Sequence, residues 1–507
     1  MTTSSICIMI AIVAYLALVI AIGIYFSRKN RTTDDFYLGG RKLGPFVTAM
    51  SAEASDMSSW LLMGIPGLAY ASGIADPAWT AIGLAVGTYL NWLFVAKRLR
   101  KYSVINKSTT IPAFFSNRYA DRHKVLSVIA ALVIIVFFVP YTASGFSACG
   151  KLFSTLFGAD YMTAMIISAI VIVVYTTLGG FLAASTTDFI QSIVMTIALA
   201  VVLFYGAHQA GGWDAVWANA KGLTGYLSMH AMYDGAGGST PYSALTICST
   251  LAWGFGYFGM PHILLRFMAI EDERKLTMSR RIATVWVTIA MFSAIIIGIV
   301  VNGMTANGSI GTLADPETAM VAVADLLSSH GVLTALVAGI IMAGILAATM
   351  STADSQLLAA ASSASQNIVK EVLVKDMDEK KSMLVARGTV VLVAIIGVFI
   401  AQDPNSSVFQ IVSFAWAGFG GAFGPLMLFS LFWRRTNFAG ALAGMIGGGV
   451  MVFVWKFLVR PLGGIWNIYE LLPAFLVSAL LIVVVSLLTK APSEDVTGDF
   501  DKVQLLK

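Results

Sequence analysis

Few of the 507 residues carry a charge. Asp, Glu, Lys and Arg make up 12% of the chain, whereas soluble domains contain about 25%. No polar linker divides the sequence, and apolar residues account for 58% of it. Together with a mean hydropathy of +0.81, this excludes a soluble multidomain protein. The composition predicts one membrane domain over 1–489 and a short cytoplasmic tail over 490–507.

Residues that build disulfides and metal centres are also scarce. The five histidines are scattered, and the three cysteines all fall in apolar segments without a CxxC pattern: Cys7, Cys149 and Cys248. No nucleophile and base stand at a catalytic spacing. We therefore expect neither an enzyme nor an organic cofactor. The net charge of +5 resides in short loops rather than in one basic stripe, so no nucleic acid partner is expected.

Long apolar runs fill the remaining sequence. A membrane span needs about 20 apolar residues, and we predict thirteen of them, which makes the protein an all-α, multi-pass protein of the cell membrane with the lipid bilayer around it. The first run is too long for a signal peptide and follows no basic region, so we expect it to be retained. The predicted spans are 5–27, 44–71, 75–96, 125–157, 161–181, 187–207, 241–262, 281–303, 321–360, 385–402, 406–433, 437–459 and 466–489.

The basic residues lie almost entirely on one side of these spans. If the amino terminus is outside, 28 of the 32 Lys and Arg residues fall in cytoplasmic segments. Three fall in outer loops, namely Lys221, Lys456 and Arg460, and Lys151 lies inside a span. Because positive residues collect in cytoplasmic loops, this predicts an outer amino terminus and a cytoplasmic carboxyl terminus.

Two spans that are five apart share an interruption by glycine and proline. The second contains Gly64, Pro66 and Gly67, and the seventh contains Gly254, Gly256, Gly259 and Pro261. Five is an odd number, so the second interrupted span crosses the membrane in the opposite direction. This arrangement predicts an inverted repeat, with 44–207 as the first copy, 241–433 as the second, and 5–27 and 437–489 as accessory spans.

An acidic residue stands in the second span. Asp56 is flanked by Ser55, Ser58 and Ser59, and an Asp at the centre of a membrane helix costs roughly 2.5–3.5 kcal/mol. Such a residue indicates an ion or substrate site, although an Asp that only satisfies a helix end is the alternative. Glu53 lies three residues earlier. Two neighbouring carboxylates can share a proton, so proton coupling stays open.

A second group of oxygens lies in the ninth span. Ser351 and Thr352 are adjacent, and Asp354 follows them. Intramembrane hydroxyls often bond only their own helix. Facing a broken helix, however, two hydroxyls suit a hard cation such as Na⁺, which binds carbonyl and hydroxyl oxygens. Asp354 either supports this site or serves a gate or inner cavity.

Aromatic residues accompany these oxygens. Trp253, Tyr257 and Pro261 recur at i, i+4 and i+8, which predicts one shared helix face in the seventh span. Trp60 and Tyr141 lie in other spans. The glycines beside these rings leave space for a small ligand, and ordinary packing is the alternative.

Several motifs are familiar as a set, and the chain resembles the sodium/solute symporter family over nearly its whole length. Within that family it resembles the branch that carries L-proline. The resemblance rests on Asp35-Phe-Tyr-Leu-Gly-Gly-Arg41, Ser51-Ala-Glu-Ala-Ser-Asp-Met-Ser58, Gly179-Gly-Phe-Leu-Ala183 with Thr187-Asp188 and Gln191, Gly256-Tyr-Phe-Gly-Met-Pro-His262, Met350-Ser-Thr352 with Gln356, and Ala415-Trp-Ala-Gly-Phe-Gly420 with Phe423-Gly-Pro425.

The resemblance implies a leucine-transporter-type core of five plus five inverted helices that carries one Na⁺ per substrate. It assigns the sodium ligands to the carbonyls of Ala54, Met57 and Ala348 and the hydroxyls of Ser351 and Thr352. It makes Asp56 essential for sodium coupling, and Arg41 and Asp188 match further functional positions. Ser58 falls where the sodium and substrate sites meet. The residues implied to line the substrate pocket are Trp60, Tyr141, Trp253, Tyr257 and Pro261.

Three positions depart from the proline branch. Ser59 stands where Gly is usual, Glu53 replaces a small residue, and Met260 stands where Gln is expected. The function that follows is symport of Na⁺ and L-proline into the cytoplasm by alternating access, for which a monomer is sufficient. The alternatives are sodium or proton symport of another small amino acid or carboxylate, a channel, or a nutrient sensor. The 17 residues after Lys490 argue against a sensor.

Overall fold

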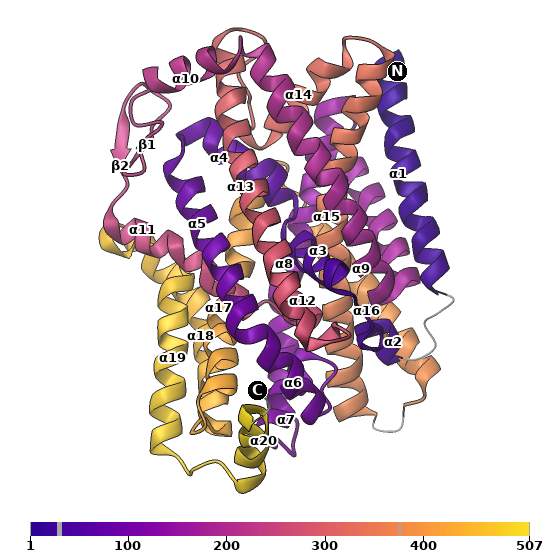
Figure 1. The fold of residues 1–507 in the computed structure, drawn as a ribbon, viewed down its shortest axis with the longest axis vertical. Coiled ribbons are helices and arrows are strands. Elements are labelled where there is room, and N and C mark those ends of the chain that lie inside the picture. The colour runs from indigo at the N-terminus through magenta and orange to yellow at the C-terminus, as the bar shows by residue number, and fades with distance from the viewer. Residues whose placement is uncertain (1, 28–32, 375–376, 506–507) are drawn as a thin grey trace.

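Helices that cross the molecule from end to end dominate the fold (Figure 1). The computed structural model describes residues 2–27, 33–374 and 377–505. Parts of two predicted cytoplasmic loops and the last two residues of the predicted tail therefore lie outside the described residues. Among those described, ten helices are long and apolar enough to span a membrane. They include α1 (Thr3–Ser27), α5 (Ala75–Leu90), α8 (Val125–Phe157), α9 (Tyr161–Gln209), α13 (Leu276–Ala306), α15 (Val332–Ser362), α16 (Glu379–Ile400), α17 (Val408–Phe432), α18 (Phe438–Val454) and α19 (Leu471–Leu488).

The second predicted span is a broken helix, but the break differs from the prediction. Helix α3 (Pro45–Asp56) ends at Asp56, and a π-helical turn (Trp60–Gly64) then leads into α4 (Ile65–Ser72). The chain remains helical through Gly64, where the expected interruption is absent. Small residues are needed there for packing, because a Cβ on Gly67 would lie 3.0 Å from the backbone of Pro316.

The seventh predicted span is broken as expected. Helix α11 (Ala244–Leu251) continues as a 3₁₀ segment, η4 (Ala252–Phe258), and α12 (Pro261–Ala269) begins after two non-helical residues. Segment η4 and α5 pack backbone against backbone. A Cβ on Gly87 would lie 2.3 Å from the carbonyl oxygen of Gly254, and a Cβ on Gly254 would lie 2.3 Å from that of Gly83.

Of two further predictions, a pair of spans is present as two helices, and one long span is not a single helix. The spans predicted over 161–181 and 187–207 are two helices, Tyr161–Thr177 and Gly179–Gln209, which the bounds of α9 join across a sharp kink at Gly180 (φ 65°, ψ −170°). Glycine is required there because other residues rarely adopt this conformation. The long span predicted over 321–360 is instead two helices, α14 (Ala319–Ser328) and α15, and Gly331 (φ 130°) lies between them.

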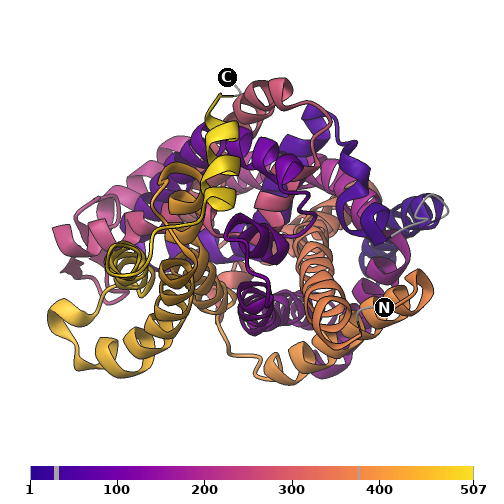
Figure 2. The ribbon, with the colours of Figure 1, turned by 90° about the horizontal axis from the view of Figure 1, so that it is seen from below.

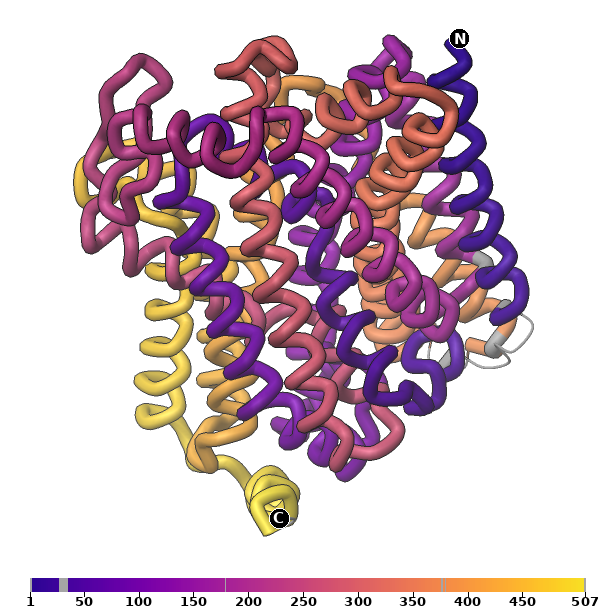
Figure 3. Tube along the Cα trace, turned by 45° about the horizontal axis from the view of Figure 1, so that its top comes forward, coloured from indigo at the N-terminus to yellow at the C-terminus, as the bar shows by residue number. Residues whose placement is uncertain are grey.

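Short elements cover the two ends of the bundle. At the amino-terminal end lie α10 (Trp213–Gly222) and a hairpin of β1 (Ala231–Tyr233) and β2 (Ser239–Pro241), paired antiparallel with Met232 opposite Thr240. This hairpin departs from the all-α expectation. The preceding loop is joined to the helices by the amide of Ile74, which donates to the carbonyl of Tyr226 (2.9 Å). Figure 3 shows the hairpin and the carboxyl terminus at opposite ends.

The other end carries the remaining short helices, namely α2 (Thr33–Leu38), α6 (Lys97–Ile105), α7 (Ile111–Arg118) and α20 (Glu494–Leu505). Seen along the bundle, α1 and the α18–α19 pair lie on opposite sides (Figure 2). Helix α3 contacts α9, α12, α13 and α15. The acidic second span is therefore enclosed by other helices, away from the lipid.

Candidate functional site

The end of α3 frees backbone carbonyls in the protein interior. The amide of Met57 closes the last turn by donating to Glu53 O (2.7 Å), and its own backbone (φ −74°, ψ 71°) leaves the helix. The carbonyl of Asp56 accepts from the indole N–H of Trp60 (2.9 Å) and the hydroxyl of Tyr141 (3.3 Å). Its carboxylate Oδ2 accepts from the hydroxyl of Tyr257 (2.6 Å). Asp56 therefore binds two of the predicted pocket residues through its backbone and a third through its side chain.

Helix α15 presents its hydroxyl pair to this helix end. The hydroxyl of Ser351 donates to the carbonyl of Ala54 (2.8 Å) and lies 3.1 Å from the carbonyl oxygen of Ala348. The hydroxyl of Thr352 donates to the same Ala348 carbonyl (3.2 Å). Four of the five groups that the sequence assigned to sodium thus meet at one place. Met57, the fifth, lies at the helix end three residues after Ala54.

The aromatic residues form one cluster beside Asp56. Trp60 stacks on Trp253 (ring centroids 6.5 Å apart), and both Trp253 and Tyr257 contact Trp416 (6.1 and 5.1 Å). The indole of Trp416 donates to the carbonyl of Trp253 (2.8 Å). The sequence prediction missed three members of this cluster, although Trp416 belongs to a motif quoted above. These members are Phe409, Trp416 and Tyr469.

The reason predicted for this clustering was wrong. Trp253, Tyr257 and Pro261 do not share one α-helical face, because η4 is a 3₁₀ helix and the chain breaks after Phe258. Pro261 begins α12, and Met260 before it has an extended backbone. Tertiary contacts with α17, rather than helical periodicity, bring the two rings together.

The two departures near Asp56 are both fully buried. Glu53 Oε1 accepts from the hydroxyl of Thr88 (2.9 Å) and the indole N–H of Trp92 (2.8 Å), both from the α5 side. The hydroxyl of Ser59 has no hydrogen-bond partner among the described residues, whereas that of Ser58 accepts from the amide of Trp60 (3.4 Å). The sequence placed Glu53 near Asp56 but carried no signal for its partners on α5.

Asp188 and Asp354 belong to a separate polar network. The guanidinium of Arg266 forms an ion pair with Asp188 (3.1 Å) and donates to the hydroxyls of Ser355 (2.6 Å) and Ser51 (3.0 Å). Ser51 donates to Asp188 (2.6 Å), and Ser355 donates to Asp354 (3.1 Å). Arg266 falls between the spans predicted over 241–262 and 281–303, yet it is buried within α12. Arg266 therefore binds Asp188 directly and is linked to Asp354 through Ser355, and this network lies apart from Asp56's hydrogen-bond partners.

Arg41 occupies a third location. Its guanidinium donates to the carbonyls of Met268 (2.6 Å) and Ser108 (2.7 Å) and to the hydroxyl of Ser103 (2.9 Å). These partners come from α12, α6 and the loop that follows α6. Arg41 thereby links the end of α12 to the short helices at the carboxyl-terminal end.

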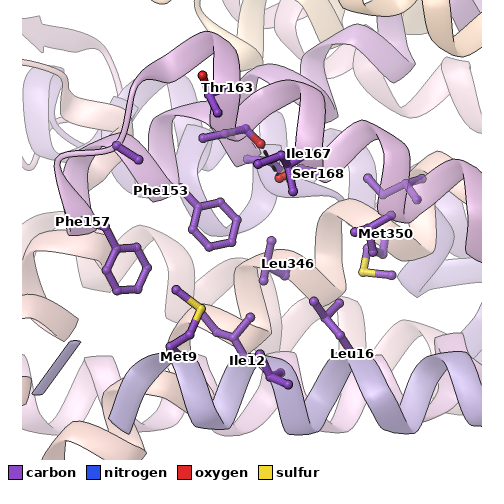
Figure 4. A pocket seen from close by; sticks show the side chains of 16 residues that line it. Met9, Ile12, Leu16, Phe153, Phe157, Thr163, Ile167, Ser168, Leu346 and Met350 are labelled. Atoms are coloured by element: carbon purple, nitrogen blue, oxygen red, sulfur yellow. Dashed lines mark hydrogen bonds between the residues drawn. The ribbon is translucent and has the colours of Figure 1, made fainter. Parts of the chain in front are cut away.

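A separate cavity of about 340 Å³ lies between α1, α8, α9 and α15 (Figure 4). Met9, Ile12 and Leu16 face Phe153 and Phe157 across it. Its lining is almost entirely apolar and contains no charged residue. Because a charged solute loses its hydration there without gaining polar partners, this cavity does not suit an amino acid.

The fold and these contacts define a multi-pass membrane transporter with buried polar sites at the breaks of two helices. The family model described as "Sodium:solute symporter family" matches residues 36–448. The chain therefore belongs to the sodium:solute symporter family, and Na⁺ is the ion with which this family couples transport.

Similar proteins extend over the full length. The sodium/proline symporter of Haemophilus influenzae is 41% identical over 98% of this chain and 97% of its own length. Sodium/proline symporter 2 of Staphylococcus saprophyticus is 39% identical over 98% and 95%. A Na⁺-coupled sialic acid symporter in a substrate-bound, outward-open state shares the fold, with a TM-score of 0.78, 17% identity, and coverage of 96% of this chain and 99% of that one.

The packing around Trp416 yields a first prediction. A Cβ on Gly256 would lie 1.9 Å from the indole nitrogen of Trp416, which donates to Trp253. We expect Gly256→Ala to displace Trp416 and lower solute uptake at least about tenfold, since shifts of about 1 Å at a site have effects of that order. The matched control is Gly303→Ala, where the nearest atoms are 3.7 Å away. Equal uptake by the two variants, at equal amounts in the membrane, would contradict the packing argument.

Proposed function

We propose that the protein is a secondary active transporter that couples the uptake of L-proline to Na⁺ by alternating access. One observation carries the proposal. The carbonyl of Ala54 at the end of α3 meets the hydroxyls of α15, and the adjacent Asp56 holds the aromatic cluster through Trp60 and Tyr257. Because both sites depend on the same helix break, binding at one site can change the affinity of the other, and this is what coupling requires.

The proposed sodium site uses the carbonyls of Ala54, Met57 and Ala348 and the hydroxyls of Ser351 and Thr352. Sodium is a hard cation that binds oxygen ligands, and unwound carbonyls and helix carboxyl ends supply them in transporters. Asp56 adds negative charge next to this site without being one of the ligands. Sodium bound there links the broken span to α15.

The proposed substrate site lies beside it, between the rings of Trp60, Tyr141, Trp253 and Tyr257, with Pro261 at the start of α12. Apolar ring faces suit the pyrrolidine ring of proline, and the hydroxyls and free backbone groups suit its charged ends. Sodium/proline symporters at 41% and 39% identity support this choice. Ser59 and Met260 favour the second candidate, a small amino acid other than proline, because both depart from the proline branch beside the proposed pocket.

The proposed coupling is energetically sufficient. One elementary charge moving through 100 mV supplies about 2.3 kcal/mol, and a tenfold sodium gradient supplies about 1.4 kcal/mol. At one sodium ion per solute, these values support accumulation by several hundred-fold. We further propose a core of two inverted repeats, 44–207 and 241–433, with Asp188, Asp354 and Arg41 acting in coupling or gating at the inner side.

The defining experiment is uptake of labelled L-proline by proteoliposomes with and without an inward sodium gradient. We expect accumulation above the external concentration only with the gradient, because sodium binding is what makes uptake energetically uphill. A channel would equilibrate proline without concentrating it. Sodium-dependent accumulation of another amino acid in place of proline would keep the coupling and change the substrate.

Two substitutions test the sodium site. Asp56→Asn removes the charge beside it, and Thr352→Ala removes a proposed ligand. We expect both to raise the sodium concentration for half-maximal uptake by about tenfold or more, the effect of losing about 1.4 kcal/mol of binding free energy. Thr349→Ala is the control, because the hydroxyl of Thr349 bonds Ile345 O of its own helix. Wild-type sodium dependence in both test variants would refute this site.

The proposed orientation has an outer amino terminus and a cytoplasmic carboxyl terminus. It places the exposed hairpin residue Ala236 outside and the exposed Lys502 of α20 inside. In a variant whose native cysteines are replaced by serine, we expect a membrane-impermeant maleimide to label Ala236→Cys in intact cells. Lys502→Cys should react only after permeabilisation. The reverse pattern would invert the topology.

A further inference from the structure

Two carboxylates lie on the last turn of α3 without a cation beside them. Glu53 and Asp56 are both fully buried, and they are within electrostatic range of each other. Among the described residues, no Lys, Arg or His forms an ion pair with either one. The carboxyl end of α3 adds the partial negative charge of its carbonyls. With both carboxyls ionised, this part of the interior carries more negative charge than the described residues balance.

Each carboxylate keeps one oxygen available. Glu53 Oε1 is held by Thr88 and Trp92, whereas Glu53 Oε2 has no hydrogen-bond partner. Asp56 Oδ2 is held by Tyr257, whereas Asp56 Oδ1 has none. Donors thus fix the position of both side chains from two different elements, α5 with its π-helical extension (Asn91–Ala96) and η4.

Other buried oxygens near this helix end are also without partners. The hydroxyl of Ser59 follows Asp56 by three residues and is fully buried. Asn91 donates to the carbonyl of Tyr257 (2.9 Å) and leaves its own Oδ1 without a partner. Buried polar atoms are almost always paired. The unpaired atoms in this set are two carboxyl oxygens, one amide oxygen and one hydroxyl oxygen, all of which can bind a positive ligand.

The sodium site proposed above does not account for these atoms. Its ligands are backbone carbonyls and the hydroxyls of Ser351 and Thr352, which lie toward α15. Glu53 is instead held from the α5 side, and one sodium ion balances only one of the two carboxylates. Hard cations select carboxylate and hydroxyl oxygens of this kind.

We propose that the free oxygens of Glu53 and Asp56, together with the hydroxyl of Ser59, bind a second sodium ion. The inference rests on the proposed function, which it deepens by giving this chain two sodium ions per solute. The second ion sits between α3 and α5, so it joins the unwound segment to α5 as the first joins it to α15.

Sodium binding to the purified protein tests the site without any solute. We expect radioactive ²²Na⁺, measured at saturation, to bind at two ions per wild-type chain and at one per chain in Glu53→Gln. Glutamine keeps a carbonyl oxygen for Thr88 and Trp92 but removes the charge. Asp76→Asn is the matched control, because Asp76 is a carboxylate at the other end of α5 bonded by Tyr242 (3.0 Å), and it should keep two ions.

The outcomes separate the two proposals. One ion per wild-type chain overturns the second site and leaves the proposed function intact, whereas no bound sodium removes both. A wild-type value of one is decisive even if Glu53→Gln fails to fold, and two ions bound by folded Glu53→Gln would also overturn the proposed site. A second measurement shows whether both bound ions are also transported. Proteoliposomes are held at zero voltage with about tenfold more L-proline inside than outside, and the inward sodium gradient at which net proline flux stops is determined. Two carried ions balance that gradient at about a threefold inward sodium gradient, and one balances it at about tenfold.

A proton is the competing occupant. If the wild-type protein binds one sodium ion, and the balance point shifts with an imposed pH gradient at fixed sodium, the carboxylates hold a proton. That result overturns the proposed sodium ion.

Discussion

In a membrane interior every backbone polar group must find a hydrogen-bond partner, and this requirement governs the structure. Ending α3 at Asp56 frees carbonyls where water and lipid headgroups are out of reach, and each unsatisfied group there costs several kcal/mol. The indole of Trp60 in the π-helical turn, two phenols from α8 and η4, and a hydroxyl from α15 converge on that end. The same oxygens that must be satisfied in the resting protein are the ones that suit a cation. Structural necessity and ion binding thus use one set of atoms.

Much of the fold could be predicted from the sequence because membrane spans have a strong signal. The apolar runs, the paired interruptions and the acidic residue at Asp56 each reflect a single physical rule that operates along the chain. The meeting of Ser351 with Ala54 was also anticipated, but only through resemblance to a family. Nothing in the spacing of residues 54 and 351 indicates that they touch.

What the sequence could not supply depends on contacts between distant segments. Gly64 and Gly67 suggested a helix break. In the structure the chain is helical there, and glycine is needed because Phe409 and Pro316 pack against these two positions. Arg266 had the charge of a loop residue and was buried because Asp188 compensates it. Phe409, Trp416 and Tyr469 joined the aromatic cluster from elements that the hydropathy pattern describes only as apolar. Composition can indicate that a residue is buried, but not what covers it.

The glycine contacts between α5 and η4 have a mechanical consequence. Where Gly83 and Gly87 meet Gly254, no side chains separate the two backbones, so there is no deformable layer through which one element could slide over the other. We therefore expect α5 and η4 to move as one rigid unit. Any movement that opens the aromatic cluster must carry α5 with it in full, and with α5 travel the two donors that position Glu53. Thr88 of α5 and Tyr257 of η4, which donate to Glu53 and Asp56, are therefore held in a fixed relation to each other by this glycine contact.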